Sequence, residues 1–85
     1  MNKQKKSRPI SEIALEIQAD WSKQKSGVSP FAKPYLTAML RLTNVTDRYL
    51  FDDGRTVISY FLSNAGSWRG EKAKQIKAEL RELIK

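Results

Sequence analysis

The chain contains neither cysteine nor histidine. Without cysteine it can form no disulfide bond and offers no thiolate to a metal ion. Without histidine it lacks the commonest general base, the commonest side-chain ligand of transition metals and the usual pH switch. A zinc site would have to use carboxylates alone, which is rare. We therefore expect a protein that is not an enzyme and needs no cofactor and no metal.

Long apolar runs are missing as well. No stretch reaches the ~18 residues that span a bilayer, and the cationic start MNKQKKSRPI is not followed by the apolar segment of a secretory signal. We expect no membrane partner and a cytoplasmic location. The length of 85 residues is enough for one domain and too short for two.

Positive charge is concentrated at the amino terminus. Lys3, Lys5, Lys6 and Arg8 supply four charges of the formal net charge of +7. Because this segment offers no apolar surface to a core, we expect residues 1–8 to be a flexible, disordered basic arm. Residues 9–85 are then expected to form a single helical domain.

Apolar residues repeat at three- and four-residue spacing, which predicts about four helices in an all-α, compact bundle. The expected segments run between Ser11 and Gly27, from near Pro34 to Leu42, from Asp52 or Asp53 to Gly66, and from Ser67 to the end. A staple between Ile10 and Leu15 is expected at the first helix. A short strand over TVISYF is the alternative for the third segment. The predicted core comprises Ile13, Ile17, Trp21, Tyr35, Leu36, Met39, Leu40, Val57, Ile58, Phe61, Leu62, Ile76, Leu80 and Leu83.

The stretch SNAGSWRGEKAK at residues 63–74 joins the last two predicted helices and raises the question of a DNA-binding helix-turn-helix. If Gly66 were its turn glycine, Lys72 and Gln75 would have to be the apolar packing positions. Both are polar, and the apolar residues lie one position later, at Ala73 and Ile76. The pattern therefore favours an ordinary corner of a helical bundle.

The last helix carries a basic flank formed by Lys74, Lys77, Arg81 and Lys85. Together with the amino-terminal arm, this flank is the basis of our leading hypothesis, electrostatic nucleic-acid binding without sequence specificity. The alternative is that the flank is only a solvated face.

A rival hypothesis is a protein–protein adaptor that uses an exposed aromatic surface at Tyr49, Phe51 and Trp68. Trp68 has a second interpretation, in which it packs into the corner before the last helix. The neighbouring Asp52 and Asp53 are interpreted as helix caps or salt-bridge partners, not as a catalytic or calcium-binding pair. A self-associating helical protein is a third possibility, and the sequence leaves the oligomeric state open.

The segments ISEIALEIQADW, PYLTAML and FDDGRTVISYFLSNAGSWRGEKAKQIKAEL resemble a group of short bacterial proteins associated with phages, plasmids and conjugative elements. The resemblance spans most of residues 10–80 and excludes the basic arm. It implies a compact helical body and a mobile-element context. That group has no established activity, so the resemblance assigns no functional residues.

Overall fold

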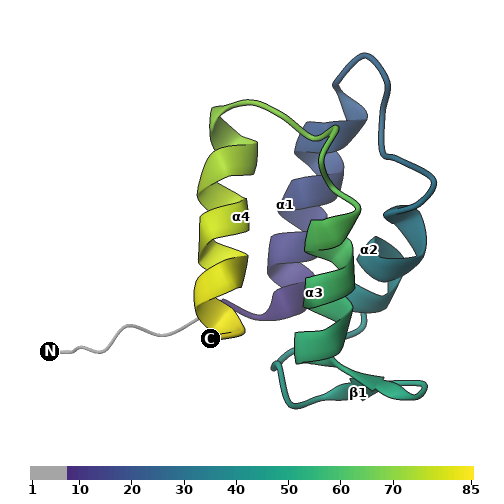
Figure 1. Cartoon of the computed structure of the whole chain (residues 1–85), viewed down its shortest axis with the longest axis vertical. Helices are drawn as coiled ribbons and strands as arrows, with labels where there is room; N and C mark the ends of the chain where they lie inside the picture. Colours follow the sequence, from purple (N-terminus) through teal and green to yellow (C-terminus); the bar gives the residue numbers. More distant parts are fainter. Residues whose placement is uncertain (1–7) are drawn as a thin grey trace, which may run out of the picture.

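Four helices and one very short strand pair make up the computed structural model, which describes residues 8–85 (Figure 1). The elements in chain order are α1 (Ile10–Ser22), α2 (Lys33–Met39), β1 (Arg48–Tyr49), β2 (Asp52–Asp53), α3 (Gly54–Ser63) and α4 (Glu71–Leu83). The prediction of a small helical bundle is confirmed. The fold is not strictly all-α, however, because β1 and β2 pair antiparallel, with Arg48 opposite Asp53 and Tyr49 opposite Asp52. The alternative of a strand over TVISYF is wrong, since these residues lie in α3.

The start of α1 is stabilised by a distant part of the chain. The backbone N–H groups of Ile10 and Ser11 donate to the carbonyl oxygens of Thr43 and Leu42, at 3.0 and 2.8 Å. Ser11 is therefore inside the helix and is not its N-cap. The predicted staple is also wrong, because Leu15 is 60% exposed.

The first turn of α2 explains how the helix accommodates Pro34. The carbonyl of Ser29 accepts hydrogen bonds from the N–H groups of Ala32 and Lys33, both at 3.0 Å, and leads the chain into the helix. Pro34 then occupies the first turn, where a missing N–H removes no helical hydrogen bond. The predicted start near Pro34 is confirmed to within one residue.

Two aspartates organise the connection between α2 and α3. Asp47 accepts hydrogen bonds from the N–H groups of Thr43 and Asn44, at 3.0 and 2.9 Å. Asp53 is the N-cap of α3 and accepts from the N–H of Thr56 at 2.9 Å. Capping was the favoured interpretation of Asp53, and it is confirmed.

Replacing Asp53 with asparagine is expected to reduce the acid sensitivity of the fold. The hydrogen bond from the backbone of Thr56 lowers the pKa of Asp53, so the ionised form stabilises the folded chain above about pH 4. That contribution is lost as the pH falls through the lowered pKa, whereas asparagine caps a helix without titrating. Urea unfolding at pH 7 and pH 3 should therefore give a smaller difference in midpoint for Asp53→Asn than for the parent chain. Glu12→Gln is the control, because it removes an exposed carboxylate that makes no ion pair within residues 8–85. An unchanged difference in Asp53→Asn would contradict the capping role.

The connection between α3 and α4 occupies residues 64–70, which is longer than the turn of a helix-turn-helix. The two helices run in opposite directions in Figure 1, with α4 beside α1 as well. The corner interpretation therefore agrees with the structure. The helix starts later than predicted, because its N-cap is Gly70, at φ +109°, and not Ser67.

The core lies where the apolar faces of all four helices meet. Most of the predicted core residues are buried, while Tyr35, Leu40, Leu62 and Leu83 are partly buried against it. Further residues outside the predicted core are also buried: Ile10, Ala14, Ala32, Ala38, Leu42, Ala65, Trp68 and Ala73.

Candidate nucleic-acid interface

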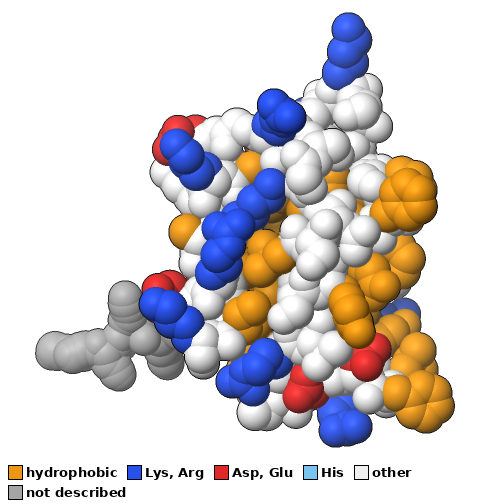
Figure 2. All heavy atoms as spheres, in the orientation of Figure 1, with side chains coloured by type: hydrophobic (Ala, Val, Ile, Leu, Met, Phe, Trp, Pro, Cys, Tyr) orange, Lys and Arg blue, Asp and Glu red, His pale blue; other side chains and the backbone are white. Residues whose placement is uncertain are grey.

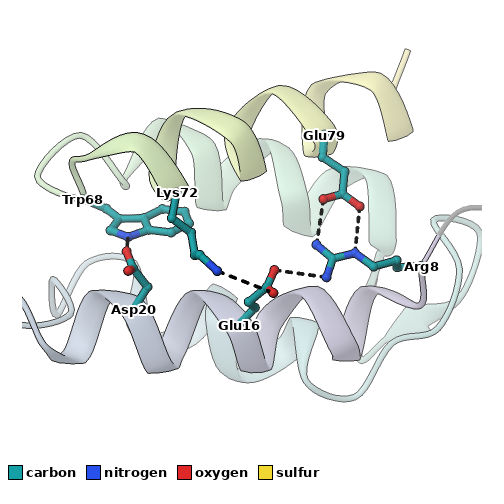
Figure 3. Close-up of polar contacts among 6 residues, drawn as sticks. All are labelled: Arg8, Glu16, Asp20, Trp68, Lys72 and Glu79. Carbon is teal, nitrogen blue, oxygen red and sulfur yellow. Dashed lines mark hydrogen bonds and ion pairs between the residues drawn. The ribbon is translucent and has the colours of Figure 1, made fainter.

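Arg8 is bound to the helical body and does not belong to the predicted flexible arm. Its Nε and Nη2 atoms donate to the two carboxylate oxygens of Glu79 on α4, at 3.1 and 2.8 Å. Its Nη1 atom lies 3.0 Å from Glu16 on α1, and Lys72 reaches the other oxygen of Glu16 at 3.8 Å (Figure 3). The hydrogen bond to Glu79 is the main reason that the pKa of Arg8 is raised.

Because of these ion pairs, Arg8 no longer belongs to the candidate phosphate-binding site. A guanidinium that already bridges two carboxylates offers little net charge to a phosphate group. Arg8 is therefore a link between α1 and α4, and its assignment to a flexible arm is wrong. Lys3, Lys5 and Lys6 lie outside the described residues, so their role stays a prediction.

Trp68 belongs to the core and not to an exposed partner surface. Only 1% of it is exposed, and its ring stacks on Trp21 with the centroids 5.8 Å apart and an interplanar angle of 20°. Phe61 meets the edge of this pair, and the indole Nε1 donates to Asp20 on α1 at 2.9 Å (Figure 3). Of the two interpretations of Trp68, packing into the corner is the one the structure supports.

Lys77 organises the loop that precedes α4. Its ammonium donates to the carbonyl oxygens of Ala65 and Trp68, both at 2.9 Å, and lies 5.8 Å from the centre of the Trp68 ring. Burial lowers the pKa of Lys77, and the positive charges of Arg81 and Arg69 lower it further. These contacts indicate that Lys77 positions the loop. Its positive charge adds to those of the neighbouring Arg69 and Arg81.

A groove of about 350 Å³ lies between this loop and α4. Four cationic residues line it and no carboxylate does. They are Arg69, Lys74, Lys77 and Arg81, and the remaining lining residues are Gly66, Trp68, Gly70 and Ala73. Figure 2 shows cationic side chains following α4 down one side of the molecule. We call this feature the basic groove.

The basic groove differs from the predicted flank at two positions. Arg69 was missed, because it lies in the loop and shares no helical spacing with the lysines of α4. Lys85 is not part of the groove, and it pairs instead with Glu82 at 3.0 Å. The helical spacing of Lys74, Lys77 and Arg81 was sufficient to predict the other three.

Of the predicted aromatic surface, only the part at the β1–β2 connection is exposed. Phe51 is 91% exposed and its neighbour Leu50 is 78% exposed, whereas Tyr49 is partly buried against the core. Figure 2 shows hydrophobic side chains protruding along the edge of the molecule opposite α4. This surface and the basic groove are therefore separate.

Within residues 8–85 there is no group of three or more carboxylates that could hold a metal ion. None of the helices within residues 8–85 combines the length and the apolar character that a bilayer-spanning segment requires. Comparisons with family models, curated proteins and solved structures found no match for this chain. The resemblance to proteins of mobile elements therefore stays a prediction.

Proposed function

We propose that this chain is a non-enzymatic accessory protein that binds the phosphate backbone of nucleic acid through the basic groove. The observation that carries the proposal is the lining of the groove, in which four cations gather without a carboxylate. Phosphate contacts of this kind give affinity and position a protein, but they read no base sequence. The proposed binding is accordingly electrostatic and non-specific.

The dimensions of the groove suit a short run of phosphates. Lys74 and Arg81 are separated by ~10 Å along α4, at 1.5 Å per residue. Phosphates of one strand are about 3.4 Å apart along the duplex axis and farther apart in space, because the strand also winds around the axis, so this distance spans neighbouring phosphates of one strand. Arg69, Lys74 and Arg81 are all exposed and able to contact these phosphates, while Lys77 holds the loop.

Neutralising the three exposed cations is expected to weaken binding and its salt dependence together. In the variant Arg69→Gln/Lys74→Gln/Arg81→Gln, three phosphate contacts are lost, each contributing about −0.9 to the slope of log K against log salt on a duplex. The slope should become less steep by about 2.7. Mobility-shift titrations of a short duplex between 50 and 200 mM salt measure it.

A control variant removes the same charge elsewhere. Lys33, Arg41 and Arg55 are exposed, lie outside the groove and make no ion pair within residues 8–85. Replacing these three with glutamine should change the slope much less than the groove variant does. Equal effects of the two variants would show that binding depends on the net charge of the protein and not on the basic groove. Absence of binding at 50 mM salt would reject the proposed function.

The adaptor hypothesis is weaker, because Trp68 is not available to a partner. The residues that could still contact a partner protein are the exposed Phe51 and the partly buried Tyr49. Recovery of a protein partner after nuclease treatment would support it, provided that the groove variant still binds that partner.

A further inference from the structure

The tip of the β1–β2 connection presents two large apolar side chains in an unusual backbone conformation. Leu50 has a φ of +59°, the left-handed region that non-glycine residues seldom occupy. Such a conformation is strained for a residue that carries a Cβ atom. Leu50 and Phe51 are nonetheless the most exposed large apolar residues in the described part of the chain. The fold therefore tolerates a strained turn that places apolar surface in water.

An apolar pocket of about 220 Å³ lies between this tip and α2. Its walls include Pro34, Tyr35 and Ala38 of α2, together with Val57 of α3. This volume is below the roughly 300–1,000 Å³ typical of small-molecule sites, and it suits a single large side chain. The residues of the tip line the pocket on its other side, so a protruding side chain and a hollow lie next to each other.

The charge at the pocket restricts what can enter it. Asp52 is its charged lining residue, is exposed, and makes no ion pair within residues 8–85. An entering segment therefore matches the pocket best if it carries an apolar side chain with a cation beside it. This chain's own tip has that combination, because the Nη2 atom of Arg48 donates to the carbonyl of Phe51 at 3.3 Å. The other guanidinium donors of Arg48 remain available for a carboxylate.

We propose that this surface joins two copies of the chain in a symmetric dimer, in which Phe51 of each copy enters the pocket of the other and Arg48 of each copy meets the other's Asp52. A two-fold interface brings the same patch together from both sides, so it requires a patch that complements itself. The tip and its pocket satisfy this requirement in shape and in charge. The dimer does not depend on nucleic acid, and the basic groove is not part of it.

Sedimentation equilibrium of nuclease-treated protein tests the dimer. At 150 mM salt the Debye length is about 8 Å, so repulsion between two chains of net charge +7 is largely screened. The parent chain should show a monomer–dimer equilibrium, and Phe51→Ser should weaken it at least about tenfold, or ~1.4 kcal/mol. Leu15→Ser is the matched control, because Leu15 is 60% exposed on α1 and lies outside the pocket. It should leave the equilibrium unchanged.

A charge exchange tests the pairing across the axis. Arg48→Asp and Asp52→Arg should each weaken the dimer, since each places like charges opposite one another. The double variant should restore it. Failure of the double variant to restore association would overturn the proposed pairing, and an equal loss in Phe51→Ser and Leu15→Ser would overturn the proposed surface. A parent chain that is monomeric up to about 1 mM would overturn the dimer.

Discussion

Replacing Trp68 with alanine is expected to lower the free energy of unfolding by about 3–5 kcal/mol. The substitution empties the centre of the stack that Trp68 forms with Trp21 and Phe61. It also leaves the carboxylate of Asp20 without the indole donor and removes the ring beneath Lys77. A small domain has a total stability of ~5–15 kcal/mol, so a loss of this size is a large fraction of it. Urea unfolding followed by circular dichroism measures the change.

A pair of phenylalanine variants separates the hydrogen bond from the packing. Trp68→Phe loses the bond to Asp20, whereas Trp21→Phe loses none, because the buried Nε1 of Trp21 has no partner within residues 8–85. Both variants shrink a fully buried indole in the same stack. A hydrogen bond to a charged group contributes about 1.5–3 kcal/mol, so Trp68→Phe should be the more destabilising. Equal losses would mean that the bond to Asp20 contributes nothing.

Replacing Gly54 with alanine is expected to destabilise the fold by about 3 kcal/mol, at the upper end of the usual cost of overpacking. A Cβ atom at this position would lie 2.8 Å from both the carbonyl oxygen of Asn44 and the Cα of Val45. Both are backbone atoms, and the hydrogen bond from Gly54 N–H to the carbonyl of Asp47, at 2.8 Å, keeps the two segments together. The same substitution in an unobstructed helix would stabilise it by about 1 kcal/mol. The close contact with residues 44–45 therefore turns an expected gain in stability into a loss. Denaturation in urea gives the difference.

Gly66→Ala provides the comparison for this result. A Cβ atom at Gly66 would meet nothing within 4 Å, and the residue does not have a positive φ. Alanine should therefore be neutral there, or stabilising by up to about 1 kcal/mol through the unfolded chain. If Gly54→Ala behaved in the same way as Gly66→Ala, the close approach of residues 44–45 to α3 would be wrong.

Helical periodicity was a sound guide to the elements because it depends on local spacing. Ile13, Ile17 and Trp21 were assigned to one face of the first helix, and all three are buried. The third segment was ambiguous between helix and strand, since TVISYF contains β-branched and aromatic residues. The segment forms a helix that Asp53 caps, and Val57, Ile58 and Phe61, which follow helical spacing, are buried in it.

The errors at helix ends have a different physical origin. Ser11 has the chemistry of an N-cap, but the carbonyls of residues 42–43 take over that function from another part of the chain. Ser67 also has cap chemistry, yet the chain continues to Gly70 because Trp68 is drawn into the core and Lys77 binds the loop carbonyls. Contacts between distant segments determine where these helices begin, and such contacts cannot be predicted from the local spacing of residues.

The residues of the basic groove that lie on α4 were predicted, whereas the residue that lies in the preceding loop was missed. Lys74, Lys77 and Arg81 share a helical face, so their proximity was predictable. Arg69 joins them only because the loop folds back on α4. Arg8 leaves the predicted set for a similar reason, since Glu16 and Glu79 come together only when α1 packs beside α4.

The hydrogen bonds from Ile10 and Ser11 to residues 42–43 also bear on how the chain acquires its structure during translation. The first helix is made early, but the acceptors for its leading amides are added roughly thirty residues later. A lone helix of this length is marginal in water and frays at an uncapped end. The beginning of α1 therefore cannot form these two hydrogen bonds until residues 42–43 have been synthesised, so its first turn stays uncapped while the rest of the helix is already complete.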